Sequence, residues 1–159
     1  MSRALAIDCE MVASGSMSLL ARVTIVDENG RVILDEYVKP SYVITDYRSC
    51  YSGIKKSDLE NGSDFSIVRN KVANLINGCI LVGHSLHFDL DALKLSHPDS
   101  NCRDLAKYEP FTRTNGGQPV ALKTLARLYL GRTIQDGVHN SAEDAKACMD
   151  LYRTRRYNW

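Results

Sequence analysis

Two carboxylate side chains stand one residue apart in an otherwise apolar stretch near the start of the chain. Residues 4–12 read ALAIDCEMV, in which Asp8 and Glu10 interrupt the apolar run. Side chains of an extended strand alternate between its faces, so a strand here directs both acids to the same side. Two anions this close repel each other unless a cation lies between them, and Mg²⁺ and Mn²⁺ prefer carboxylate oxygens. The pair predicts a divalent-metal site, although a half-buried strand with one wet face has the same pattern.

Two further acids lie beside the apolar faces of expected helices. In a helix over residues 141–155, Asp144 lies near the edge of the apolar stripe, where an unpaired carboxylate is costly. When Asp144 is considered alone, its position is explained more simply by a favourable interaction between its carboxylate and the positive N-terminal end of the helix dipole. In a helix over residues 86–95, Asp89 lies beside the apolar face, whereas Asp91 is about 200° away around the helix and is expected to face water.

His139 lies in a segment with turn-forming residues, five positions before Asp144. A histidine beside a carboxylate site suits proton abstraction near neutral pH. Each of the four histidines also fits a purely structural role. His139 is therefore a candidate general base whose role depends on whether the acids converge.

The order of these residues resembles the three motifs of DEDDh exonucleases. Asp8-x-Glu10 falls on a first strand, Gly83-His84-x-x-x-x-Asp89 follows a buried strand, and His139-x-x-x-x-Asp144 opens the last helix. Other segments resemble the eukaryotic branch that contains ribosomal-RNA-processing, interferon-stimulated and apoptosis-enhancing RNA exonucleases. These segments are Asp8-Cys9-Glu10-Met11-Val12, Asp46-Tyr47-Arg48, Ser52-Gly53-Ile54, Arg103-Asp104, Leu122-Lys123-x-Leu125 and Ser141-x-Glu143-Asp144-Ala145.

The resemblance implies a 3′-to-5′ exoribonuclease that acts on single-stranded RNA with a free 3′ end and releases nucleoside 5′-monophosphates. Two divalent cations, Mg²⁺ or Mn²⁺, would be held by Asp8, Glu10, Asp89 and Asp144. His139 would take the proton from the attacking water. Two cations about 4 Å apart stabilise both the attacking and the leaving oxygen of an in-line displacement.

The resemblance also implies a contact with the terminal nucleotide from Met11, and Arg48 and Leu86 are further candidates for such contacts. Arg48 also fits a role in capping a turn or pairing with a surface acid. We expect Arg48 and Met11 to sense the ribose 2′-hydroxyl, which distinguishes RNA from DNA. Exposed cations could line the phosphate path, namely Lys123, Arg127 and Arg113. Two other functions stay open: a 3′-to-5′ DNA exonuclease with the same metal chemistry, and a catalytically silent domain that binds nucleic acid or protein.

Composition sets broader limits. The 159 residues are 44% apolar and 25% charged, which is typical of a single globular domain over 1–159. The net charge is +1, so the chain has no global positive field that would attract nucleic acid. Five spread cysteines without a C-x-x-C pair argue against a disulfide framework or a zinc site. No signal peptide or membrane span is expected, so we predict an intracellular protein, a monomer or weak dimer. The resemblance implies a nuclear location and leaves a cytoplasmic one open; the sequence names no protein partner.

Hydrophobic periodicity and turn residues predict an α/β fold with a mixed sheet. By resemblance this is a ribonuclease H-like fold with a five-stranded sheet, three antiparallel strands followed by parallel ones, flanked by helices. The expected strands are 4–12, 20–26, 31–38 and 79–82, with a loop over 13–18 and a hairpin turn at Asn29-Gly30. The expected helices are 65–76, 86–95, 119–130 and 141–155, the last with Ser141 as N-cap, and a helical turn near 103–108.

Overall fold

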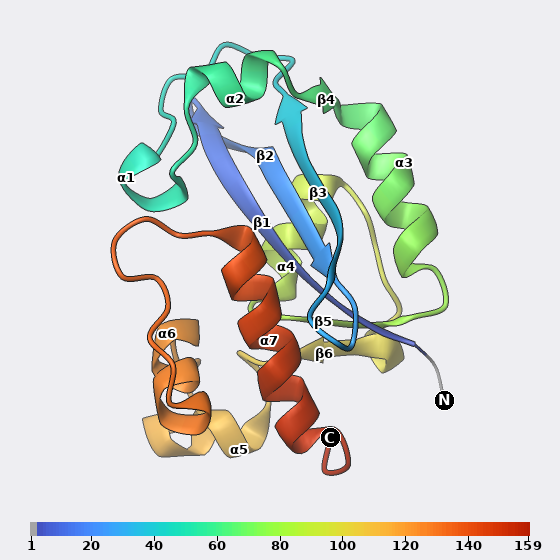
Figure 1. Cartoon of the computed structure of the whole chain (residues 1–159), viewed down its shortest axis with the longest axis vertical. Helices are drawn as coiled ribbons and strands as arrows, with labels where there is room; N and C mark the ends of the chain where they lie inside the picture. Colours follow the sequence, from blue (N-terminus) through green and yellow to red (C-terminus); the bar gives the residue numbers. More distant parts are fainter. Residues whose placement is uncertain (1–2) are drawn as a thin grey trace.

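A computed structural model of the chain describes residues 3–159, in which one mixed sheet carries helices on both faces (Figure 1). Within these residues the sheet has six strands in the order β4-β3-β2-β1-β5-β6. The first three strands are antiparallel, β5 and β6 run parallel to β1, and β4 runs parallel to β3. The strands are β1 Ala4–Ser14, β2 Met17–Val26, β3 Val32–Lys39, β4 Ser63–Asp64, β5 Ile80–Gly83 and β6 Cys102–Asp104.

The helices connect and cover these strands. They are α1 Ser49–Ser52, α2 Lys56–Glu60, α3 Phe65–Ile76, α4 Leu86–Leu93, α5 Glu109–Thr112, α6 Leu122–Leu125 and α7 Ser141–Arg155. Short 3-10 turns occupy Asp99–Asn101 and Arg113–Asn115, and a π-helical turn, Ala126–Leu130, continues α6. No helix within residues 3–159 combines the length and the apolar character that a bilayer crossing requires.

Alternation along β1 decides which residues meet which helix layer. Leu5 and Ile7 face a core that contains Val68 and Val72 of α3. Ala4 and Ala6 face the opposite core, which includes much of the apolar side of α7. Continuing the alternation past Ala6 brings Asp8 and then Glu10 to the α7 side of the sheet. The central strand therefore presents its two acids to the last helix.

The expected mixed sheet between helices is confirmed, with six strands rather than five. The additional pairing comes from β4 and β6, which are two and three residues long and lie at the two edges. Two or three residues are too few to show a hydrophobic period, so the sequence does not predict these strands. They are strands because they pair with β3 and β5. The expected loop over 13–18 is also wrong, since β1 and β2 pair up to Ser14 and Met17 and leave a two-residue turn.

Three expectations about helices need correction. The segment 103–108 contains the end of β6 and no helix. The nearest helix, α5, starts at Glu109. The helix expected over 119–130 begins at Leu122, since the residues after Pro119 are extended. Asn140, not Ser141, is the N-cap of α7, because its side-chain oxygen accepts a hydrogen bond from the Ala142 N–H at 3.0 Å.

Candidate metal centre

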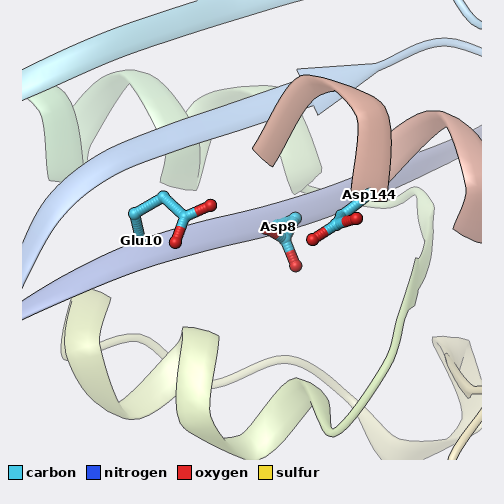
Figure 2. Close-up of side chains that lie close together, drawn as sticks. All are labelled: Asp8, Glu10 and Asp144. Carbon is cyan, nitrogen blue, oxygen red and sulfur yellow. The ribbon is translucent and has the colours of Figure 1, made fainter. Parts of the chain in front are cut away.

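Three carboxylates from distant parts of the sequence converge on one point. Asp8 and Glu10 of β1 and Asp144 of α7 each place a carboxylate oxygen within 4.8 Å of the others (Figure 2). Glu10 is 7% exposed and Asp144 is 2% exposed, while Asp8 is half-buried. The prediction that Asp8 and Glu10 share one face of a strand is therefore confirmed, and Asp144 meets them there.

Buried polar contacts fix the start of α7 over the sheet. Ser141 shares a hydrogen bond of 2.7 Å with Thr24 of β2, and both residues are fully buried. Thr24 lies directly opposite Asp8 in the β1–β2 ladder. Because Asp144 lies one turn beyond Ser141, this contact anchors its carboxylate above β1.

Two oxygens of this cluster are buried without a hydrogen-bond partner. They are Glu10 Oε1 and Asp144 Oδ1, and neither has a partner among residues 3–159. A buried carboxylate oxygen without a partner is costly, so a native structure rarely leaves one uncompensated. Three oxygen donors at this spacing fit a hard divalent cation, which would satisfy both atoms.

Asp89 adjoins the cluster through the open edge of β1. Strand β5 pairs with β1 only at Ala4–Ala6, and beyond that point the Cys9 N–H donates to Asp89 Oδ1 at 2.9 Å. Asp89 is 4% exposed, and its charge raises the pKa of Asp8. Asp91 is exposed, as helix geometry predicted.

Two local features hold α4 close enough for this contact. A Cβ atom at Gly83 would collide with the Leu86 side chain and lie 3.3 Å from the Ile7 carbonyl oxygen, so glycine permits the close approach of α4 to β1. The Asp104 carboxylate accepts hydrogen bonds from the N–H groups of Ser85 and Leu86 at the start of α4, at 2.7 and 3.2 Å. Asp104 therefore supports Asp89 indirectly, which its sequence position did not reveal.

Burial raises the pKa of every acid in the centre, and repulsion from the other acids of the centre adds to it for Asp8 and Glu10. Burial, followed by the Asp144 charge, raises the pKa of Glu10 to about 8. Burial raises the pKa of Asp89 to about 7 and that of Asp144 above its usual value. Burial and then the Asp89 charge raise the pKa of Asp8 well above its usual range. Without a cation the acids therefore share protons near neutral pH, and a cation would take the place of those protons.

His139 lies in the loop 131–140, which leads from the π-helical turn after α6 to the start of α7 (Figure 1). Its backbone N–H donates to the Tyr51 carbonyl oxygen of α1 at 2.6 Å. Burial raises the pKa of Asp144, while the Gln135 hydrogen bond and then the His139 charge lower it. The role of His139 as general base stays a prediction.

Gln135 is a site residue that the sequence analysis missed. Its amide Nε2 donates to Asp144 Oδ2 at 2.8 Å. The other carboxylate oxygen of Asp144, Oδ1, is the one without a hydrogen-bond partner among the described residues. Gln135 has φ = 55°, an unusual backbone conformation for a residue with a side chain. It lies in an aperiodic loop, so no pattern in the sequence distinguishes it.

The three expected nucleotide contacts lie around the same end of the sheet. Met11 follows Glu10 directly, with a bulge between them, and packs partly buried on the α3 side. Leu86 is buried at the start of α4. The Arg48 guanidinium donates to Ser18 Oγ at 3.0 Å, and the preceding Asp46 bridges to Ala13 at the end of β1. Their roles toward a nucleotide stay predictions.

Comparison with known proteins places this geometry in a family. The family model described as "Exonuclease" (RNase_T) matches residues 5–152, which include all four acids and His139. The chain belongs to this exonuclease family.

Longer curated proteins are strongly similar to the chain. RNA exonuclease 4 of Mus musculus is 44% identical over 163 aligned residues, covering 100% of this chain and 38% of the relative. RNA exonuclease 4 of Aspergillus fumigatus is 47% identical over 152 residues, covering 93% of this chain and 49% of the relative. The chain thus spans less than half the length of these curated relatives.

Solved structures with a similar fold come from Pan2. The Neurospora crassa Pan2 catalytic unit (protease and nuclease domain) superposes with a TM-score of 0.89 at 27% identity, covering 98% of this chain and 27% of that chain. A Saccharomyces cerevisiae Pan2 module in complex with AAGGAA RNA gives a TM-score of 0.87 at 31% identity, covering 98% and 29%. The ribonuclease H-like fold inferred from the resemblance is thereby confirmed.

Proposed function

We propose that this chain is a metal-dependent 3′-to-5′ exoribonuclease that releases nucleoside 5′-monophosphates from single-stranded RNA. The observation that carries the proposal is the convergence of Asp8, Glu10 and Asp144, with two buried oxygens that lack hydrogen-bond partners among the described residues. Membership of the exonuclease family supports the reaction class. The relatives named RNA exonuclease 4 and the RNA-bound Pan2 module favour RNA over DNA as substrate.

The proposal gives the residues of the centre two roles, metal binding and proton transfer. Asp8, Glu10 and Asp144 would hold divalent cations, Mg²⁺ or Mn²⁺, and Asp89 on α4 would contribute to holding a second one. Divalent cations held there would supply positive charge for the attacking and leaving oxygens and would lower the pKa of the attacking water. An imidazole nitrogen of His139 takes the proton from the attacking water as a general base.

Terminal-nucleotide binding falls to residues at the end of β1 and the start of α4. Met11 and Leu86 supply apolar surface against the last sugar and base, and Arg48 reads the ribose 2′-hydroxyl. The Arg48–Ser18 hydrogen bond supports this assignment, because it holds the guanidinium beside the β1–β2 turn, beyond Glu10.

A digestion experiment tests the proposal. Single-stranded RNA labelled at its 5′ end is incubated with the chain and Mn²⁺, with EDTA in a parallel sample. We expect a ladder that shortens from the 3′ end only when Mn²⁺ is present, with nucleoside 5′-monophosphates as the released product. Internal cleavage, or a ladder equally strong in EDTA, would contradict the proposal, and binding without cleavage would favour the silent-domain alternative.

Gly53 offers a test of how His139 is placed. A Cβ atom at Gly53 would lie 2.5 Å from Val138 Cγ1, and Gly53 has φ = +67°. We expect Gly53→Ala to push the loop 131–140 outward and lower kcat on RNA by about 10- to 100-fold, because small displacements of a catalytic group are costly. Steady-state kinetics on the labelled RNA measures the effect.

Gly116→Ala is the matched control for Gly53→Ala. Gly116 has φ = +61°, and a Cβ atom there would meet open space. Both variants carry the same backbone strain, about 1–2 kcal/mol of unfolding free energy. We expect only Gly53→Ala to lower kcat. An equal loss of activity in the two variants would show that strain alone, and not the position of the His139 loop, is responsible.

A further inference from the structure

A hollow beside the metal centre is lined by two cationic side chains. Its volume is about 290 Å³, and its wall includes Lys123 and Arg127 from α6 and the π-helical turn, with Gln135 and Asp136 from the facing loop. Lys123 and Arg127 are four residues apart, so they lie on the same side of the helix. Neither forms an ion pair or a side-chain hydrogen bond with any residue between 3 and 159, Asp136 included.

Arg113, which the sequence also indicated for a phosphate path, differs from these two. Its guanidinium makes two hydrogen bonds of 2.8 Å to the Glu109 carboxylate. A neighbouring carboxylate thus already pairs with its charge and takes two of its five N–H donors. Of the three cations that the sequence indicated, the two without an ion pair among the described residues both line the hollow.

The hollow and the metal centre share Gln135. The Gln135 side chain lines the hollow, and its amide Nε2 bonds to Asp144 Oδ2 at 2.8 Å. The hollow that the two cations line is therefore separated from a carboxylate of the metal centre by one glutamine side chain. A strand whose last phosphate lies at the metal centre would bring another phosphate of the same strand into reach.

We propose that this hollow binds a backbone phosphate of the RNA strand on the 5′ side of the scissile bond. The proposal rests on the proposed function, because an enzyme that removes the 3′-terminal nucleotide leaves every other phosphate on the 5′ side. Lys123 and Arg127 supply the charge, and the Thr124 and Thr133 hydroxyls that also line the hollow can donate to phosphate oxygens. Such contacts bind any base sequence and weaken as salt rises.

The test compares substrates with and without a 5′-side phosphate. The double variant Lys123→Ala/Arg127→Ala is assayed with Mn²⁺ on an RNA of about eight nucleotides, and on the dinucleotide ApA, whose single phosphate is the scissile one. We expect the double variant to raise KM on the longer RNA by about tenfold more than on ApA, with kcat little changed. Equal losses on the two substrates would overturn the proposal.

Lys146→Ala is the matched control. Lys146 is an exposed cation of α7 without an ion pair among the described residues, and it lies near Gly30 in the β2–β3 turn. We expect wild-type kinetics from it on both substrates. A loss in Lys146→Ala equal to that in the double variant would mean that net charge, not the hollow, governs binding.

Binding without turnover separates failure of this inference from failure of the proposed function. Fluorescence anisotropy of a 5′-labelled RNA in EDTA measures Kd at several salt concentrations. We expect the slope of log Kd against log salt to fall by about 1.4 in the double variant, roughly 0.7 for each cation that no longer neutralises a phosphate. An unchanged slope would overturn the inference even in an active enzyme. Absence of cleavage by the wild type would overturn the proposed function. The salt dependence of binding would then still show whether the hollow binds an RNA phosphate.

Discussion

Replacing Asp144 by asparagine is expected to lower kcat on single-stranded RNA by about 1,000-fold or more, roughly 4 kcal/mol of transition-state stabilisation. The variant keeps the shape of the side chain and an oxygen that can accept the Gln135 hydrogen bond, but it removes the charge that holds the cation. The same change is expected to raise the melting temperature of the metal-free protein. Burial raises the pKa of Asp144, so the ionised carboxylate costs folding free energy that a neutral amide does not.

Single-turnover kinetics and thermal melts in EDTA measure the two effects. Each 1 kcal/mol gained corresponds to about 2–4 °C for a chain of this size. Glu143→Gln is the control, because Glu143 is exposed on the same turn and its loss also removes one negative charge. We expect it to change neither quantity appreciably. An Asp144→Asn enzyme with wild-type kcat would exclude Asp144 from the reaction.

The stabilisation of the protein by Mn²⁺ is expected to grow as pH rises from about 5 to about 8. The folded-state pKa of Glu10 is about 8, above its ordinary value of 4.5, and that of Asp89 is about 7, above 3.8. Across this window the unfolded chain has released protons that the metal-free fold retains, so the metal-free stability falls with pH. The slope approaches about 1.4 kcal/mol per pH unit for each group. It levels off above the folded-state pKa values.

Bound Mn²⁺ is expected to remove this loss, because it binds the deprotonated carboxylates. Melting temperatures measured with Mn²⁺ and with EDTA should therefore be close at about pH 5 and well separated at about pH 8. The variant Glu10→Gln should flatten the pH dependence of the EDTA series, since it removes one of the titrating groups. A Mn²⁺-induced shift that is the same at both pH values would contradict the protonated state of the metal-free centre.

The sequence predicted the parts of the site that depend on local geometry. Strand alternation correctly paired Asp8 with Glu10, and helix geometry separated the buried Asp89 from the exposed Asp91. Each of these inferences needs only the period of one element. The resemblance to a known family then indicated that the separate motifs form one site, and the family match over residues 5–152 includes all of them.

The sequence could not predict contacts that depend on how distant segments meet. Gln135 binds Asp144 from an aperiodic loop, and Val138 lies against Gly53 from a segment more than 80 residues away. Strand β6 is a strand only because three residues pair with β5. Tertiary packing determines these features, and no local propensity reports them.

Titration of Mn²⁺ into the protein, followed by electron paramagnetic resonance of the free ion, tests the central claim most directly. The account predicts saturable binding of two Mn²⁺ ions by the wild type and a large loss of affinity in Asp8→Asn, while the exposed control Asp91→Asn binds as the wild type does. Equal Mn²⁺ binding by Asp8→Asn and the wild type would contradict a metal centre built on these carboxylates.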